Sequence, residues 1–530
     1  MKNLFNTAIM KKLILCIVWS VIVSGVLAQT HITIADPATW TVSELSPYIG
    51  QTVIFDTPLI VTSNYGSLSV SPRRIFAATN QERPLTEGYY NLLTLNGNGS
   101  LTLNGVSEYH RMGEKIYNLT ATVLPNALTF ISGDWHGNTR ADLEKDLPDV
   151  DMYGKHTLLV CGANLEYYLV EQFSSPGPKN DAQHQKQRVK VSQALAKINA
   201  DIYGLVEVQQ GNGALKEIAE DLTKNTGRQF TYIYDPKGAN GTFTKSSFVY
   251  CSDVVEPYGE IQNIETGVSN RKKMQIFREK SSGEMFIFSI NHFKAKSSGG
   301  YGADADQGDG QGGYNNARKG EALAVLTKYK SLAAQLGDEK DILIMGDLNA
   351  YGKEDPIYTL ISDGMTDLHR YFHRDSSYSY TFHSEAGYLD HALCNETLLP
   401  QITGMGAFHI NSDESDEFTY DKSSDATMFR CSDHDPVLVG IRLDGTKQSA
   451  PNLNINSWQV YNEGDMIRIR NAAGMEMKAF CRIYTVDGRL MEQVEIIEDL
   501  QEVVRPAQSG VYVVLIYHKG ETYKFKTIVP

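Results

Sequence analysis

The pattern of apolar and polar positions changes twice along this chain of 530 residues. Over residues 31–131, short alternating runs such as 52–55 (TVIF) and 101–103 (LTL) are separated by Asn-Gly pairs. Alternation with a period of two and Asn-Gly turns predict a small β-barrel or sandwich. We expect this β-rich region to occupy residues 29–150. It has no cluster of acids and histidines, so a stabilising spacer and a substrate-binding domain are both open.

From about residue 155 to 443, strand patterns alternate with helical ones. Residues 157–160 and 202–208 are strand-like, whereas Val191, Ala194, Leu195 and Ile198 repeat at helical spacing. Further strands are expected at 248–251, 285–293, 341–349 and 436–443, with a long helix at 317–336. Some neighbouring strands are joined by hairpin-length loops, which indicates a mixed sheet. The prediction is an α/β domain over residues 151–445.

The last segment, residues 446–530, returns to alternating runs such as 482–486 and 511–516. We expect a compact β-sandwich there, with either an anchoring or a stabilising role. At the other end, residues 1–28 have two lysines, an apolar run and small residues before Gln29, which is typical of a signal peptide. A single-span anchor is the competing interpretation. Cleavage would leave a mature chain without a stable membrane span, either secreted or on the outer cell surface.

The net charge and the cysteine content limit which ligands the chain is expected to bind. The formal net charge of −14 argues against indiscriminate electrostatic binding of nucleic acid. An enzyme that uses cations to bridge its acids to a phosphate is still compatible with that charge. Beyond the leader five cysteines remain, with no short metal-type spacing among them, so a zinc site is not expected.

Candidate chemistry begins at residues 341–350 (DILIMGDLNA), where an apolar strand runs into Asp347 and Asn349. Residues two apart in an extended chain point to the same side, so both can project into one cleft. Other polar side chains also stand at the ends of predicted strands. Polar residues at the strand ends of one sheet converge naturally on one cleft. These other side chains are Asn164, Glu207, His292, Asp433 and His434.

These residue types suggest roles. Glu207 and Asp433 have the oxygen ligands that Mg²⁺ or Ca²⁺ requires. Asp390 and His434 make a plausible acid and histidine pair, in which the carboxylate orients the imidazole and raises its pKa.

Three motifs carry a family resemblance: residues 346–349 (GDLN), 388–393 (YLDHAL) and 432–437 (SDHDPV). With the Asn-ended and Glu-bearing strands before them, they resemble the deoxyribonuclease I-like endonuclease/exonuclease/phosphatase superfamily over about residues 155–443. Segments 291–296, 306–312, 347–357 and 409–414 look like those of large secreted bacterial nucleases. The resemblance implies a four-layer α/β sandwich with mixed central sheets, flanked by an N-terminal β-barrel-like domain and a C-terminal β-sandwich.

The resemblance also implies hydrolysis of a phosphodiester that depends on Mg²⁺ or Ca²⁺, with Mn²⁺ as a third candidate. Asn164, Glu207 and Asp433 match the family's metal-site residues. The matches to its catalytic residues are His292, Asp347, Asn349, Asp390 and His434. His292 is a candidate proton donor, although the acid that supports it in related enzymes has no clear counterpart.

Substrate contacts are expected from Lys294 and Lys296 on one strand and from Asn316 and Arg318 after the Gly- and Asp-rich stretch 299–313. Plain solvation of the lysines and a merely flexible loop are the alternatives. The stretch does not have EF-hand spacing, because Gly308 stands where Asp or Asn would be needed and Asn315 stands where an acid would be needed.

The flanking regions have weaker resemblances. Residues 486–489 and 509–514 resemble the sorting domain of the type IX secretion system, which implies a secretion-machinery partner. The N-terminal region is compared with an oligonucleotide-binding barrel, although no motif carries that comparison.

The sequence thus predicts a secreted, divalent-metal-dependent nuclease that hydrolyses DNA by attack of an activated water, with RNA as an additional candidate substrate. A sphingomyelinase- or phosphoinositide-phosphatase-like phosphoesterase of the same fold is the enzyme alternative. A surface adhesin without catalysis is the alternative from another class.

Overall fold

The computed structural model describes most of the chain and divides it into two compact units. The described residues are 30–81, 99–145, 153–235, 244–266, 271–297, 299–336, 340–373, 376–443, 458–463, 466–471, 479–485, 490–496, 500–504, 510–518 and 521–529. The first unit comprises Met1–Leu398 and Ile402–Gly445, and the second comprises Leu399–Gln401 and Thr446–Pro530. The predicted signal peptide, residues 1–28, lies outside the described residues.

The N-terminal region of the first unit is a β-barrel. Its strands are β1 (Thr30–Ile32), β2 (Thr52–Phe55), β3 (Leu59–Ser63), β4 (Ser69–Ser71), β5 (Leu101–Asn104), β6 (Lys115–Leu124) and β7 (Ala127–His136). The sheet order is β1-β2-β6-β3-β4-β5-β7, and β6 also pairs with β7, so the strands from β6 through β3, β4 and β5 to β7 close into a ring. Alternating residues such as Val53, Phe55, Leu59 and Val61 fill its interior. The short helices α2 (Ala78–Gln81) and α4 (Arg140–Lys145) also belong to this region.

Two mixed sheets form the middle of the first unit. The first has the order β10-β11-β9-β8-β21-β20 and the second has the order β12-β13-β14-β15-β19-β16. The strands of the first sheet are β8 (Leu158–Tyr168), β9 (Ile202–Gln209), β10 (Phe230–Tyr232), β11 (Thr244–Cys251), β20 (Ile402–Ala407) and β21 (Val437–Ile441). Those of the second are β12 (Val255–Asn263), β13 (Lys272–Glu279), β14 (Met285–His292), β15 (Ile342–Asp347), β16 (Thr366–Asp367) and β19 (Asp390–Cys394).

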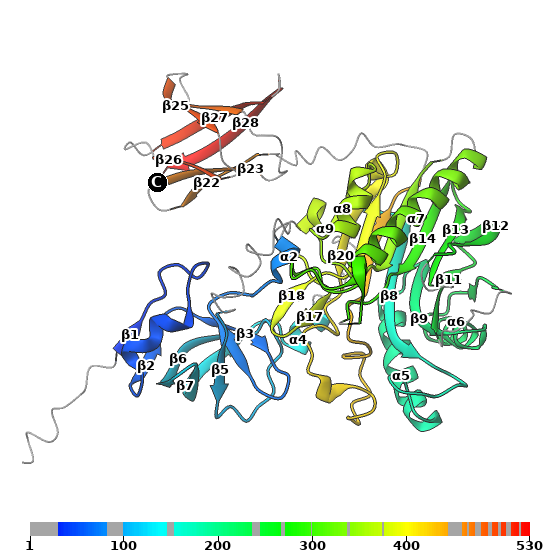
Figure 1. Cartoon of the computed structure of the whole chain (residues 1–530), viewed down its shortest axis with the longest axis horizontal. Coiled ribbons are helices and arrows are strands. Elements are labelled where there is room, and N and C mark those ends of the chain that lie inside the picture. Colours follow the sequence, from blue (N-terminus) through cyan, green and yellow to red (C-terminus); the bar gives the residue numbers. More distant parts are fainter. Residues whose placement is uncertain are drawn as a thin grey trace, which may run out of the picture. The chain divides into compact units, whose positions relative to one another are not determined.

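Helices cover the outer face of each sheet, as Figure 1 shows for α5 beside β8 and α7 beside β14. These helices are α5 (Asp181–Ile198), α6 (Gly213–Thr226), α7 (Asn315–Leu336), α8 (Asp355–Ser362) and α9 (Leu368–His373). Apolar residues of α5 and α6 share one core with β8 and β9, and those of α7 and α8 share another with β14 and β15. The sheets meet so closely that a Cβ on Gly204 of β9 would lie 2.7 Å from the Phe288 ring of β14. The predicted four-layer α/β fold with mixed central sheets is confirmed.

The second unit is β-rich, as predicted. It contains a sheet of order β22-β23-β26 and another of order β25-β24-β27-β28. The strands are β22 (Trp458–Glu463), β23 (Met466–Asn471), β24 (Ala479–Thr485), β25 (Leu490–Ile496), β26 (Leu500–Val504), β27 (Gly510–His518) and β28 (Glu521–Val529). Ile467, Ile469, Cys481 and Ile516 belong to its shared core. Residues 486–489 of the sorting-domain resemblance lie outside the described residues.

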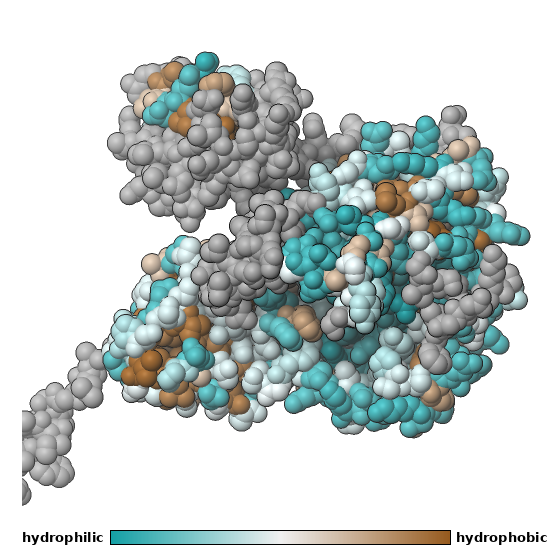
Figure 2. Space-filling model, viewed as in Figure 1, coloured by the Kyte–Doolittle hydropathy of each residue, from teal (hydrophilic) through white to brown (hydrophobic). Residues whose placement is uncertain are grey.

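The surface differs between regions. Apolar residues gather on the visible side of the N-terminal barrel in Figure 2, and Ile49, Leu124 and Ile131 of that barrel are exposed. Among the described helices, none has the length and apolar character needed to cross a bilayer.

Candidate active site

Strand register brings the predicted residues together at one end of the two sheets. Parallel pairing of β14 and β15 sets His292 opposite Asp347, and antiparallel pairing of β15 and β19 sets Asp347 opposite Asp390. In the facing sheet, the parallel strands β8 and β9 carry Asn164 and Glu207. The two sheets meet here, because Nδ2 of Asn164 donates to Oδ2 of Asp347 over 3.3 Å.

Asp347 is at the centre of this cluster and is 2 % exposed. The backbone N–H of Asn349 donates to its Oδ1 over 2.9 Å, and the Asn349 amide donates to its Oδ2 over 3.3 Å. Nε2 of His292 lies 3.7 Å from Asp347 Oδ2, and Nε2 of His434 lies 3.9 Å from the same atom. Burial raises the pKa of Asp347 to about 7, against the opposing charge of His434. A carboxyl group in this position can exchange a proton near neutral pH.

Asp390 and His434 form a buried ion pair. Nδ1 of His434 is 2.7 Å from Oδ2 of Asp390, and the Ser379 hydroxyl donates to the same oxygen over 2.8 Å. Burial alone would lower the pKa of His434, but Asp390, Asp433 and Asp347 together raise it well above its usual value. His434 is therefore an imidazolium, with Nδ1 held by Asp390 and Nε2 left to face the Asp347 side of the cluster.

A second group of carboxylates, on Glu166, Glu207 and Asp433, adjoins this pair. Burial raises the pKa of Glu207 to about 8, and the charges of Asp433 and Asp347 add to that shift. Burial likewise raises the pKa of Glu166 to about 8, with Asp433 the next contribution. Oε2 of Glu166 is buried and has no hydrogen-bond partner. Glu166 and Glu207 have positive φ angles of +48° and +60°, a strain that recurs at functional sites.

This donor set suits a hard divalent cation. A nearby cation stabilises the ionised form of buried acids such as Glu166 and Glu207, whose pKa values are raised. Carboxylate oxygens are also the ligands that Mg²⁺ and Ca²⁺ prefer. Among the described residues, no group of three or more His, Cys, Asp or Glu side chains is arranged to hold a metal ion. Mg²⁺ commonly takes only one or two carboxylates and completes its shell with water and substrate phosphate, so Glu207 with Glu166 or Asp433 would be sufficient.

His292 differs from His434 in its protonation. Burial and the positive charge of Arg271 lower its pKa well below the usual value, so the ring is neutral. Nε2 of His292 lies 3.7 Å from Oε1 of Glu207, the same distance as from Asp347. Its proposed part as a proton donor stays a prediction.

The four predicted substrate residues differ in how exposed they are in the structure. Arg318 is fully buried and donates to the backbone carbonyls of Gln311 and Gly313, so it holds the loop 299–313 from inside. Lys296 pairs with the buried carboxylate of Glu354. The expected phosphate contacts of Arg318 and Lys296 stay predictions: Arg318 is buried among backbone carbonyls, whereas the Lys296 side chain, although paired with Glu354, is 24 % exposed.

Lys294 and Asn316, the other two predicted substrate residues, are also at least partly exposed. Lys294 is partly exposed, with its ammonium 4.3 Å from the centre of the Tyr314 ring. Asn316 is exposed in the first turn of α7.

Several residues near the cluster have no counterpart in the sequence-based set. Glu166 stands two positions after Asn164, a spacing that indicates one side of a strand, but the pairing of β8 with β9 is irregular between Asn164 and Tyr168. Tyr380 stacks on the His434 ring, with centroids 4.6 Å apart. Arg430 lies just before Asp433 in the chain, whereas Tyr65 contacts it from a distant part of the chain, and no local pattern indicates that contact.

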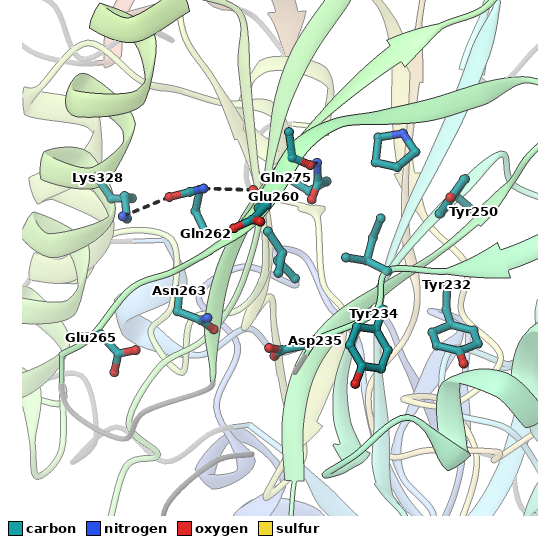
Figure 3. Close-up of a pocket in the computed structure, with 14 residues that line it drawn as sticks. Tyr232, Tyr234, Asp235, Tyr250, Glu260, Gln262, Asn263, Glu265, Gln275 and Lys328 are labelled. Atoms are coloured by element: carbon teal, nitrogen blue, oxygen red, sulfur yellow. Dashed lines mark hydrogen bonds between the residues drawn. The ribbon is translucent and has the colours of Figure 1, made fainter. Parts of the chain in front are cut away.

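A pocket of about 710 Å³ lies apart from these residues, on the β12 side of the second sheet. Figure 3 shows Lys328 of α7 on one side of it and Tyr232 and Tyr234 on the other. None of the predicted site residues lines it. Its acids, Asp235, Glu260 and Glu265, therefore belong to a separate surface.

A search of curated proteins found no significant match. An endonuclease/exonuclease/phosphatase family protein from Bacteroides thetaiotaomicron is 18 % identical, with a TM-score of 0.38, and the match covers 53 % of this chain and 93 % of that one. A mannosyl-6-phosphatase from the same species is 18 % identical, with a TM-score of 0.38 and coverage of 54 % and 99 %. The catalytic domain of human Nocturnin is 14 % identical, with a TM-score of 0.36 and coverage of 54 % and 94 %.

The family model for the Endonuclease/Exonuclease/phosphatase family matches residues 177–434, which include Glu207, Asp347, Asp390 and His434. Members of this family hydrolyse phosphoester bonds and generally use divalent cations such as Mg²⁺. Residues 177–434 of this chain are therefore an endonuclease/exonuclease/phosphatase family domain.

Proposed function

We propose that this chain is a secreted nuclease that requires a divalent cation and hydrolyses the phosphodiester bonds of DNA, and of RNA as well. The observation that supports this most directly is the position of Asp347 between two imidazoles. Its Oδ2 is 3.7 Å from Nε2 of His292 and 3.9 Å from Nε2 of His434. A phosphate beside Nε2 of His434 would leave Asp347 in reach of an attacking water.

Each residue then has a defined task. Asp347 orients the water and takes its proton, held in place by the two donors of Asn349. His434, fixed by Asp390, stabilises the negative charge that grows on the phosphate oxygens as water attacks. Glu207, together with Glu166 or Asp433, would hold Mg²⁺ or a related cation, which when bound neutralises phosphate charge.

The test is hydrolysis by the purified protein. Closed circular DNA, linear DNA, RNA, sphingomyelin and a phosphoinositide are each incubated with Mg²⁺, Ca²⁺, Mn²⁺ or EDTA. We expect cleavage of DNA and RNA with a divalent cation and none with EDTA. Intact polynucleotides under every metal would refute the proposal. Hydrolysis of sphingomyelin or the phosphoinositide alone would establish the lipid phosphoesterase alternative.

Variants identify the site and exclude contamination. His434→Ala and Asp347→Asn should each reduce cleavage by about 100-fold or more, as expected when a group that transfers a proton or stabilises charge is lost. His31→Ala is the matched control, because His31 is an exposed histidine of the N-terminal barrel. Equal activity in the parent protein and its three variants would mean that this cluster does not catalyse the observed cleavage, as the adhesin alternative predicts.

Export is a separate part of the proposal. We expect cleavage of the leader between Ala28 and Gln29, seen as a mature N-terminus by mass spectrometry. Residues 446–530 would then engage a type IX secretion machinery. In a host with that pathway, deletion of 446–530 should retain the protein in the periplasm. Release of the deleted form into the medium at the full-length rate would contradict the sorting role.

A further inference from the structure

The N-terminal barrel is joined to the catalytic domain by buried ion pairs. Two neighbouring acids, Asp413 and Glu414, have side chains with 0 % exposure. Arg74 contacts Asp413 at 2.7 Å, and Arg111 and Arg140 each contact Glu414 at 2.5 Å. Such pairs are orientation-specific, because displacing one partner leaves a buried charge unpaired.

The same segment supports the catalytic histidine. The Asn411 side-chain amide donates to the backbone carbonyl of His434 over 2.6 Å. The backbone N–H groups of Asn411 and Ser412 donate to Oδ1 of Asp435 over 2.8 and 2.9 Å. Residues 411–414 therefore contact the His434 loop at one end and the barrel at the other. The barrel has a defined position beside the catalytic cluster.

This position brings Tyr65, which follows β3 of the barrel, to the cluster. The guanidinium carbon of Arg430 is 5.6 Å from the centre of the Tyr65 ring. Burial raises the pKa of Tyr65, Arg430 opposes that shift, and the charge of Asp433 adds to it. The phenol therefore shares the electrostatic environment of the predicted metal-site acid.

Aromatic residues continue outward from the catalytic histidine. Tyr380 stacks on His434 at 4.6 Å between ring centres. Phe382 follows two residues later on the same strand, with its ring at 14° to that of Tyr380 and the centroids 6.4 Å apart. Phe382 is 54 % exposed, and its ring also stacks on that of the adjacent His383, with centroids 4.0 Å apart.

Arg430 provides a cation within this group. It is 5 % exposed and has a φ of +58°, a strained backbone angle for a residue with a side chain. Its Nη1 donates to the carbonyl of Asn411, whereas its buried Nε has no hydrogen-bond partner. A buried guanidinium with an unused donor suits an anionic ligand.

We propose that Tyr65, Tyr380, Phe382 and Arg430, here called the aromatic-arginine subsite, bind the single-stranded polynucleotide that flanks the scissile phosphate. This inference rests on the proposed nuclease function and specifies its substrate. The aromatic faces stack on unpaired bases, and Arg430 contacts a flanking phosphate. A duplex offers few such faces, because its bases already stack on one another. Since the net charge is −14, stacking supplies affinity that general electrostatic attraction does not.

The experiment measures binding and cleavage separately. A short fluorescein-labelled oligonucleotide, single-stranded or annealed to its complement, is titrated by fluorescence anisotropy into the full chain carrying Asp347→Asn, so that cleavage does not interfere. The same substrates and bis(p-nitrophenyl) phosphate, which lacks bases, are then hydrolysed by the otherwise unaltered protein. Both measurements are repeated with Tyr65→Ala, Tyr65→Phe and Phe382→Ala. Phe480→Ala is the matched control, because Phe480 is 47 % exposed in the second unit.

We expect the single strand to bind at least tenfold more tightly than the duplex. Tyr65→Ala and Phe382→Ala should each weaken single-strand binding by about tenfold, the loss of one base stack. Their kcat/KM on the oligonucleotide should fall about tenfold further than on bis(p-nitrophenyl) phosphate, mainly through KM. Tyr65→Phe should restore binding, because the ring is retained, and Phe480→Ala should match the parent protein.

Four outcomes would overturn the inference. Equal or tighter binding of duplex would remove the single-strand preference. Equal losses on both substrates in the Ala variants would reduce Tyr65 and Phe382 to a structural role. Absence of both oligonucleotide binding and cleavage would refute the subsite and the nuclease together, whereas cleavage that the variants do not alter refutes the subsite alone.

Discussion

Oδ2 of Asp390 lies 2.7 Å from Nδ1 of His434, and β19 places that aspartate directly opposite Asp347 of β15. One strand pairing therefore connects the carboxylate that raises the pKa of the histidine with the carboxylate that we propose to orient the attacking water. Asp390→Asn should lower kcat by about 100-fold or more, because the imidazolium loses the partner that keeps it charged and oriented. The measurement is steady-state hydrolysis of bis(p-nitrophenyl) phosphate across pH.

Asp367→Asn is the control for this prediction. Asp367 is also buried, but its carboxylate accepts a hydrogen bond from the Tyr388 hydroxyl. Equal losses in the two variants would mean that burial, not the histidine partner, explains the effect.

Glu207 is expected to bind the cation. Glu207→Gln should weaken Mg²⁺ binding by at least tenfold in isothermal titration calorimetry, because one charged oxygen ligand is lost. Thermal unfolding provides a second readout. Mg²⁺ at 100 times its Kd would stabilise the parent protein by about 2.7 kcal/mol, and the variant would lose most of that gain. Glu220→Gln, an exposed acid on α6, should behave like the parent. A Mg²⁺ affinity unchanged by Glu207→Gln would place the cation elsewhere.

Asp413 should make stability depend on pH in the acid range. Burial would raise its pKa, but Arg74 and Arg111 together lower it to about 2, below its ordinary value of 3.8. A carboxyl with a depressed folded pKa contributes stability above its unfolded pKa and loses it as pH falls through the folded value. The contribution is therefore complete above about pH 5, declines below about pH 4 and is lost near pH 2, with a size of about 2 kcal/mol.

Urea unfolding of the parent and of Asp413→Asn between pH 2 and 7 measures this contribution. The difference in unfolding free energy should be largest at neutral pH and shrink towards pH 2. A difference that stays constant over the whole range would show that the Arg74 and Arg111 pairs do not hold Asp413 ionised.

Lys294 and Arg318 should respond differently to salt. Lys294→Ala should reduce the slope of log K against log salt for oligonucleotide binding by about one, if its exposed ammonium meets a phosphate. Arg318→Ala should leave that slope unchanged and lower stability by about 3 kcal/mol, because three backbone carbonyls lose a buried cationic donor. Anisotropy titrations at several salt concentrations and urea unfolding measure the two effects. A salt slope altered by Arg318→Ala would support its predicted phosphate contact.

The sequence by itself determined the fold class and the strand ends that carry Asn164, Glu207, His292, Asp347 and His434. Period-two alternation and helical spacing are local properties, so strands, helices and the polar residues that end them can be recognised without tertiary information. The α/β class followed from that alternation, whereas the four layers were implied by the family resemblance. Local patterns did not distinguish Lys294, which is partly exposed, from Arg318, which is buried, because burial depends on what the fold packs over a residue.

Only the tertiary structure decided which distant residues share the cleft. Glu166 enters through an irregular, positive-φ stretch of β8 that breaks the period of two. Arg430 and Tyr65 meet through the barrel contacts of Asp413 and Glu414, more than 300 residues from the tyrosine in the chain. Such contacts depend on the docking of whole elements and leave no spacing signal in the sequence. The strand ends therefore specify the position of the candidate active site, and the docked barrel adds neighbouring residues such as Tyr65.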